Sequence, residues 1–238
     1  MEYADVIYLD PARRNEHGER TYSIGDCTPN VIELLPLLRE KADRIIIKLS
    51  PMLDWRKAVA DLAGVSEVHI ISVNNECKEL VLVVNKNNDS FRLICVNDDN
   101  IFEVSPSISH QPLTSVNDPQ YLYEPNASIM KAGCFEAIKN RFAVQQIADN
   151  SHLFISTDEI SDFPGRRFHI SAVSSMNKRE LRDTLRNIEC ANITVRNFPL
   201  TADQLRKKLK IRDGGDIYIF ATTGATGAHC LYICRKIG

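Results

Sequence analysis

No apolar run in this sequence is long enough to cross a membrane, and its composition is otherwise ordinary. The 238 residues include a single tryptophan, 10 glycines and 44% hydrophobic residues, which is typical of a folded globular protein. A membrane helix needs about 20 consecutive apolar residues. The amino terminus carries Glu2 and Asp5 where an export signal carries basic residues. We therefore expect a soluble protein of the cytoplasm, with no membrane partner.

Cysteine pairs with metal-ligand or redox spacing are also missing. The seven cysteines are odd in number and scattered, and none forms a Cys-x-x-Cys pair, so they read as reduced thiols in a reducing compartment. Cys230 and Cys234 fall on one face of a predicted strand. Core packing is the favoured interpretation for them, with a metal or redox role as the alternative.

Glycine-rich phosphate loops are absent as well. The segment TTGATGA, residues 222–228, lacks the Lys-Ser/Thr ending of such a loop, so a hairpin turn is favoured. The segment Asp213-Gly214-Gly215-Asp216 is explained by a tight turn rather than by a metal site, and we expect no metal ion.

Charge is distributed unevenly along the chain. Residues 165–238 contain 14 Lys and Arg against 6 Asp and Glu, whereas residues 1–164 contain 15 against 25. A locally basic surface attracts nucleic-acid phosphates even when the net charge is only −2. The alternative is that these cations are only solvated helix faces. The candidate RNA contacts are Arg166, Arg167, Lys178, Arg196, Lys207, Lys208, Lys210 and Arg212.

The first 85 residues alternate between strand and helix patterns. Apolar strand patterns cover residues 6–9, 44–49, 67–74 and 78–85, and helix patterns cover 28–42 and 54–64. Thr28 with Pro29 is a typical helix start. The alternation predicts a parallel sheet covered by helices, with 78–85 as an antiparallel partner of the strand before it.

The rest of the chain divides into two smaller parts. Residues 86–126 are rich in loop chemistry, and 126–142 form an amphipathic helix pattern. From residue 165 onwards the pattern is strand, helix (178–187), strand, helix (202–210) and two strands, with a capping box at Thr201 and Gln204. We therefore predict three domains, comprising residues 1–97, 98–164 and 165–238.

Polar residues follow the first two strands. Asp10 and Pro11 end the first strand, and Lys48 and Ser50 end the second. Ligands of open α/β sheets bind at the carboxyl ends of strands. Asp10 could accept a hydrogen bond from an amine, and Arg13 could hold an anion. The alternative is a helix-capping aspartate beside a solvated arginine.

These segments resemble a known family. DVIYLDPARR resembles the fourth motif of class I S-adenosylmethionine-dependent methyltransferases. KLSPMLD, YLYEPNASIMKAG, DFPGRRF and VRNFPLTADQLRKKLKIRDGGDIYIFATT resemble bacterial methyltransferase-like proteins with a C-terminal THUMP-like domain. The resemblance covers nearly the whole chain. It implies an α/β fold in which a partial Rossmann-like sheet precedes a small ferredoxin-like linker module and a THUMP-like module that binds structured RNA.

The resemblance also assigns roles and shows two departures. Asp10 would face the target and the donor, S-adenosylmethionine, and Lys48 and Ser50 would shape the adjacent wall. Many amino-group methyltransferases place an aromatic residue after Asp-Pro-Pro, but here Ala12 and Arg13 stand there, so an aromatic clamp on the target base is unsupported. His17 or Tyr22 in the following loop could substitute, but a mobile surface loop is the favoured interpretation. The glycine-rich donor-binding turn is absent from the 238 residues.

We therefore expect the C-terminal portion of an RNA methyltransferase, which does not bind the donor alone. Its first strand would leave an exposed edge open to self-association. Two alternatives remain. The chain could be a non-catalytic RNA-binding protein built on a methyltransferase scaffold, or the methyl acceptor could be a protein or a small molecule.

Overall fold

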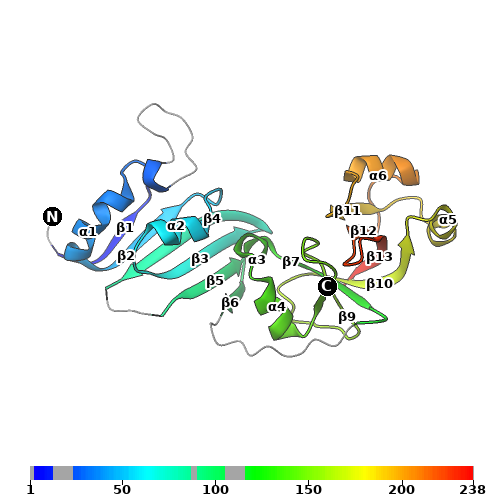
Figure 1. The fold of residues 1–238 in the computed structure, drawn as a ribbon, viewed down its shortest axis with the longest axis horizontal. Helices are drawn as coiled ribbons and strands as arrows, with labels where there is room; N and C mark the ends of the chain where they lie inside the picture. Colours follow the sequence, from blue (N-terminus) through cyan, green and yellow to red (C-terminus); the bar gives the residue numbers. More distant parts are fainter. Residues whose placement is uncertain (1–2, 13–23, 87–89, 105–115, 238) are drawn as a thin grey trace. The chain divides into compact units, whose positions relative to one another are not determined.

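The computed structural model describes residues 3–12, 24–86, 90–104 and 116–237. Within these residues the chain forms two compact units, each built on one β-sheet (Figure 1). The first unit takes its residues from 1–108 and 126–134, and the second from 109–125 and 135–238. Arg13, His17 and Tyr22 lie outside the described residues.

The first unit contains a six-stranded mixed sheet in the order β1-β2-β4-β3-β5-β6. β1 pairs with β2 in parallel, as β3 does with β5, and the remaining pairs are antiparallel. The strands are β1 (Ala4–Leu9), β2 (Ala42–Leu49), β3 (Val65–Val73), β4 (Glu76–Asn85), β5 (Arg92–Asn97) and β6 (Asn100–Val104). The four strands expected in the first 85 residues are present, and β4 is antiparallel as predicted.

A tight hairpin places β4 inside the sheet. Asn74 and Asn75 both have positive φ, 51° and 59°, as a type I′ turn requires and as asparagine tolerates. The chain therefore reverses after β3, and β4 inserts between β2 and β3. In this register Leu49 lies opposite Leu80, so the polar start of β4 reaches the carboxyl end of β2.

Helices α1 (Val31–Lys41) and α2 (Trp55–Asp61) and the 3-10 helix η1 (Ile24–Asp26) belong to this unit. The prediction that Thr28 caps α1 is wrong, because the cap is Asn30, whose side chain accepts from the backbone N–H groups of Ile32 and Glu33. Thr28 instead exchanges two backbone hydrogen bonds with Ala12. This bridge anchors the segment that follows β1.

The first sheet extends further than the sequence suggests. Asp98, at φ 52°, turns the chain from β5 into β6, which the loop-rich composition of residues 98–104 did not predict. Phe102 on β6 is 2% exposed. Burial of this ring, and the pairing with β5, stabilise a strand whose local sequence favours a loop.

The single amphipathic helix predicted over residues 126–142 is also wrong, because two helices are present. α3 (Ala127–Ala132) ends at Gly133, which adopts the left-handed conformation at φ 65°, and α4 (Phe135–Phe142) follows. α3 packs on β3, β4 and β5, whereas α4 belongs to the second unit. Gly133 therefore separates two helices that serve different cores.

The second unit contains a seven-stranded sheet in the order β11-β12-β13-β10-β7-β9-β8. Only β11 and β12 pair in parallel. The strands are β7 (Tyr121–Pro125), β8 (Gln145–Gln146), β9 (Phe154–Ser156), β10 (Gly165–Ser175), β11 (Asn192–Arg196), β12 (Ile217–Thr223) and β13 (His229–Ile237). β10 carries a register shift between Ile170 and Ala172, a bulge that bends the long central strand.

Two apolar clusters hold this sheet. One packs against α5 (Lys178–Leu185) and α6 (Ala202–Leu209) and includes Leu205, Ile219 and Leu231. The other includes Phe168, Phe220 and Cys234. The packing role predicted for Cys234 is confirmed, since it is fully buried. The capping box at Thr201 and Gln204 and the hairpin turn between β12 and β13 are confirmed as well.

Candidate functional site

The carboxyl ends of β1 and β2 meet at one edge of the first sheet. Because the two strands run in parallel with Leu9 opposite Ile47, the residues that follow them lie side by side. Lys48 Nζ donates to Asp10 Oδ2 at 2.7 Å. The structure thus brings together two residues that the sequence assigned to one site.

Lys48 holds the Asp10 carboxylate and remains charged. The hydrogen bond to Asp10 raises the pKa of Lys48, and the negative charges of Asp10 and Glu79 add to this effect. Glu79 Oε1 lies 3.8 Å from Lys48 Nζ. A lysine with a raised pKa is a poor proton acceptor at neutral pH, so Lys48 acts here as a fixed positive charge.

An open cavity of about 430 Å³ lies at this edge. Its walls include Asp10, the buried Pro11, Lys48 and Ser50. The Ser50 hydroxyl accepts from the Met52 backbone N–H at 3.3 Å, which leaves its own proton available to a ligand.

Two further wall residues, Lys78 and Glu79, were missed by the sequence analysis. They come from the start of β4, and only the position of that strand between β2 and β3 brings them here. The signal that could have located them is the Asn74-Asn75 turn, which fixes the register of β4.

The lining of this cavity is mostly polar. Its charged residues Asp10, Lys48, Lys78 and Glu79 are ion-paired. No Gly-x-Gly turn, which lets the backbone approach a nucleoside, occurs in the 238 residues. What the edge offers is a carboxylate held in place by an ammonium group, suited to accept a hydrogen bond from an amine or hydroxyl.

Two of the predicted RNA contacts meet at one buried acid. Arg166 on β10 and Arg196 at the end of β11 both donate to Glu124 on β7, and Arg196 Nη2 lies 2.7 Å from Glu124 Oε1. The Glu124 side chain is 3% exposed, whereas the two arginine side chains are 38% and 37% exposed. The sequence analysis missed Glu124.

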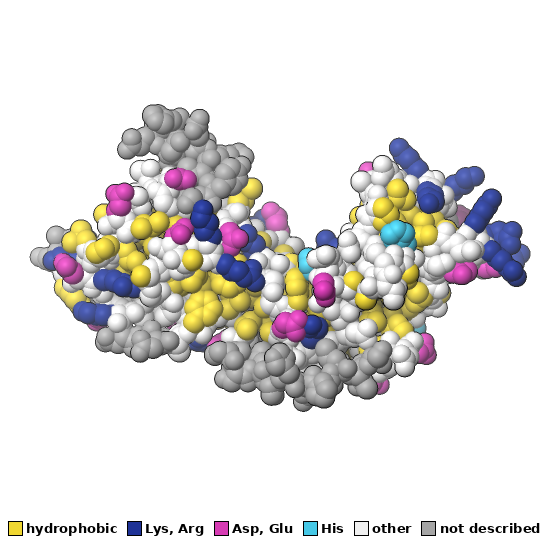
Figure 2. Space-filling view, viewed as in Figure 1, with side chains coloured by type: hydrophobic (Ala, Val, Ile, Leu, Met, Phe, Trp, Pro, Cys, Tyr) yellow, Lys and Arg dark blue, Asp and Glu magenta, His cyan; other side chains and the backbone are white. Residues whose placement is uncertain are grey.

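The other predicted contacts are spread over the second unit. Arg167 pairs with Glu159 at 3.0 Å and Arg212 with Glu189 at 2.9 Å. The exposed residues of this set are Lys178, Lys207, Lys208, Lys210 and Arg212. Figure 2 shows that Lys and Arg side chains gather over the α5 and α6 end of this unit.

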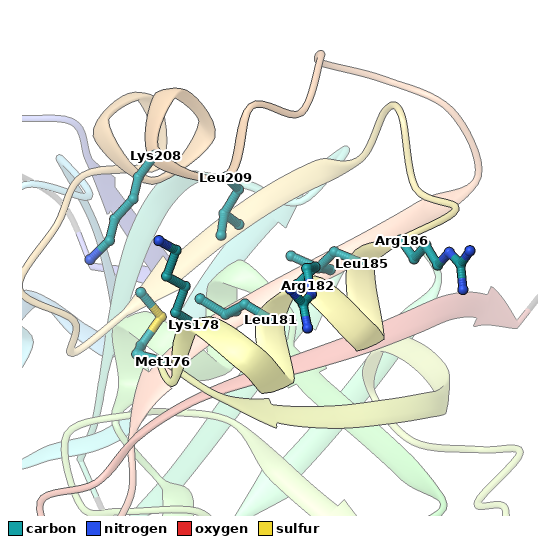
Figure 3. Close-up of a pocket in the computed structure, with 8 residues that line it drawn as sticks. All are labelled: Met176, Lys178, Leu181, Arg182, Leu185, Arg186, Lys208 and Leu209. Carbon is teal, nitrogen blue, oxygen red and sulfur yellow. The ribbon is translucent and has the colours of Figure 1, made fainter.

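Some of these cationic side chains line a groove between α5 and α6 (Figure 3). It has a volume of about 460 Å³ and an aliphatic lining of Met176, Leu181, Leu185 and Leu209. Its basic residues are Lys178, Arg182, Arg186 and Lys208. The sequence analysis did not select Arg182 and Arg186, although their spacing of four residues within the helix predicted over 178–187 was a usable signal.

Metal and membrane features are not seen in the part of the chain that the structure describes. Among those residues, no group of three or more His, Cys, Asp and Glu side chains is placed to hold a metal ion. None of the described helices is long and apolar enough to span a membrane.

Comparison with known proteins defines the class of this fold. Residues 121–164 match the profile of a ferredoxin-like domain, and residues 165–236 match a THUMP domain-like profile. The protein is thus a mixed α/β protein with a ferredoxin-like and a THUMP-like domain, as the predicted fold class has it.

One solved relative extends the likeness to nearly the whole chain. The fold is similar to the crystal structure of a "putative methyltransferase" from Porphyromonas gingivalis W83, with a TM-score of 0.86 and 32% sequence identity. The match covers 98% of this chain and 60% of the other, so this chain spans about three fifths of the length of that relative. No curated protein matches the sequence.

Proposed function

We propose that this chain is the substrate-side, C-terminal portion of an S-adenosylmethionine-dependent RNA methyltransferase. In this proposal the edge formed by Asp10, Lys48 and Ser50 is the wall that faces the methyl acceptor. The basic THUMP-like module binds the RNA. The donor would be held mainly by a further segment that the 238 residues do not include, and Asp10 would orient the methyl acceptor.

The observation that carries the proposal is the strand order β1-β2-β4-β3 with Asp10 at the carboxyl end of β1. β1 and β2 run in parallel, and the antiparallel strand β4 lies between β2 and β3. This arrangement places polar residues at the strand ends where open α/β sheets bind ligands. The methyltransferase description of the solved relative supports the same reading.

RNA is the proposed substrate because of the module that follows. Phosphate contacts from lysine and arginine provide most of the affinity for nucleic acids and do not depend on sequence. Lys207 and Lys208 are exposed on α6, and Lys210 caps that helix. The THUMP domain-like match favours RNA over a protein or small-molecule acceptor.

Reversing charge on α6 tests the RNA part of the proposal. We expect the double variant Lys207→Glu with Lys208→Glu to bind a structured RNA, such as unmodified transfer RNA, at least about tenfold more weakly than the unchanged chain. The logarithm of affinity should also fall less steeply with the logarithm of salt concentration. Fluorescence anisotropy over a salt series measures both quantities.

The matched control reverses two exposed lysines of the first unit, Lys57→Glu with Lys86→Glu. This variant has the same net charge, so a general effect of charge would weaken binding equally in both. Equal affinities of the two variants would remove the α6 face from the proposal.

A further inference from the structure

A second cavity of the THUMP-like module lies at the carboxyl ends of the parallel strands β11 and β12. It has a volume of about 460 Å³ and is lined by Val195, Asn197, Phe198, Pro199, Thr223 and His229. The carboxyl ends of parallel strands are where α/β folds place ligands, and this volume is that of a small-molecule site. None of the residues selected from the sequence contributes to it.

An aromatic pair forms one side of this cavity. The rings of Phe198 and His229 have centroids 5.2 Å apart and an interplanar angle of 65°, an edge-to-face contact. Phe198 packs partly on the apolar cluster beneath α5 and α6, while His229 is exposed. The Phe198 ring is therefore held in place by the core, as a stacking surface must be.

Hydrogen bonding determines which ring nitrogen of His229 carries the proton. The Thr223 hydroxyl donates to the Asn197 carbonyl at 2.5 Å, and this uses its one proton. The contact of 3.1 Å between Thr223 Oγ1 and His229 Nδ1 must then be donated by His229 Nδ1–H. In neutral His229, Nε2 is consequently an acceptor.

The backbone beside the ring is fixed as well. Asn197 adopts the left-handed conformation at φ 49°, and its carbonyl also accepts the Thr223 N–H at 3.1 Å. Within the described residues the Asn197 side-chain amide has no hydrogen-bond partner, and the side chain is exposed. The cavity thus combines a fixed ring, an acceptor nitrogen and an amide.

From this combination we infer that the cavity binds one unpaired nucleobase of the RNA substrate. RNA-binding proteins stack unpaired bases on aromatic side chains, a contact that every base can make, and they discriminate between bases through hydrogen bonds to the base edges. An acceptor at His229 Nε2 favours a base that presents an exocyclic amine, such as cytosine, over uracil. The inference rests on the proposed RNA-binding function and adds a base-binding site to its phosphate contacts.

The test uses the 238-residue chain and two RNA hairpins. One hairpin has a single-stranded overhang that carries 2-aminopurine, and the other is blunt-ended and serves as the reference. Stacking on Phe198 should change the 2-aminopurine fluorescence. Phe198→Leu, which keeps apolar volume but lacks a ring, should lose this change and weaken overhang binding about tenfold. Phe198→Tyr should retain both, and the blunt hairpin should bind all three chains alike.

A second readout concerns His229. The unchanged chain should prefer a cytosine overhang to a uracil overhang, and His229→Ala should lose that preference. Thermal unfolding of each variant separates loss of the site from loss of the fold.

The outcomes distinguish this inference from the proposed function. If the hairpins bind but Phe198→Leu behaves like the unchanged chain, the base site is wrong and the RNA-binding proposal stands. If the unchanged chain binds neither hairpin, both are wrong.

Discussion

At the scale of single residues, the buried carboxylate of Glu124 gives two of the predicted RNA-binding arginines a structural partner. Its carboxylate accepts from Arg166 and Arg196, which come from β10 and β11. Glu124 itself lies in the ferredoxin-like match and both arginines lie in the THUMP-like match. The ion triad therefore ties the two matched domains within the second unit, and part of the basic charge read as an RNA face has a structural role.

Removal of this carboxylate should destabilise the second unit. We expect Glu124→Ala to lower the free energy of unfolding by about 2 to 3 kcal/mol, because it leaves two partly buried guanidinium groups without their partner. Urea unfolding followed by circular dichroism measures the change.

The comparison variant is Glu159→Ala, which removes the exposed partner of Arg167. An exposed ion pair contributes at most about 1 kcal/mol. A loss for Glu124→Ala no larger than that for Glu159→Ala would contradict the importance of the triad.

At the scale of elements, the ends of helices were decided by contacts that a local pattern does not contain. Asn30 caps α1, whereas the Thr28 backbone exchanges hydrogen bonds with Ala12. α2 is capped by Asp54, whose side chain accepts from the backbone N–H groups of Arg56 at 2.8 Å and Lys57 at 3.3 Å. Trp55, the single tryptophan, follows this cap.

The Asp54 cap makes the stability of the first unit depend on pH. The backbone hydrogen bonds from Lys57 and then Arg56 lower the pKa of Asp54. A carboxyl whose pKa is lower in the folded state stabilises the fold above its unfolded pKa of about 3.9, and this contribution is lost as the pH falls through the folded value. Asp54→Ala should therefore cost about 1 kcal/mol at pH 7, and less at about pH 3.

Urea unfolding followed by Trp55 fluorescence reports on this unit specifically. Asp54→Asn keeps the side-chain acceptor without the charge, so its stability relative to Asp54→Ala should be nearly independent of pH. A cost for Asp54→Ala that stays constant between pH 7 and 3 would show that the charge is not involved.

At the scale of the whole molecule, β1 lies at the edge of the first sheet among the described strands. β1 pairs with β2 alone among the described strands, and its Val6 and Tyr8 side chains are 48% and 58% exposed. Apolar side chains on an edge strand favour pairing with another strand. The predicted self-association through this edge stays a prediction, as does the division of the chain at residues 97 and 164.

The proposal that the donor is held by a further segment predicts the behaviour of the 238-residue chain alone. Titration calorimetry with S-adenosylmethionine should give no binding in the micromolar range, because the glycine-rich turn is not among these residues. The same titration of Asp10→Asn is the control. Micromolar affinity that disappears in Asp10→Asn would show that the edge of β1 and β2 binds the donor by itself and would overturn this division of roles.

The sequence by itself determined what local patterns encode. Runs of apolar residues specified β1 to β4 and β10 to β13, and the capping residues specified α6, because burial and capping depend on neighbours within a few positions. The pairing of Asp10 with Lys48 was also predictable, since parallel strands bring their carboxyl ends to one edge.

Tertiary structure alone decided which distant residues meet. Glu79 reaches Lys48 because β4 inserts into the sheet, Glu124 meets an arginine 72 positions away, and Gly133 divides a continuous helical pattern between two cores. Phe198 and His229 face each other only through the pairing of β12 with its neighbours. Side-chain periodicity reports which face of an element is buried, but it carries no information on the partner that buries it, and that partner fixed these sites.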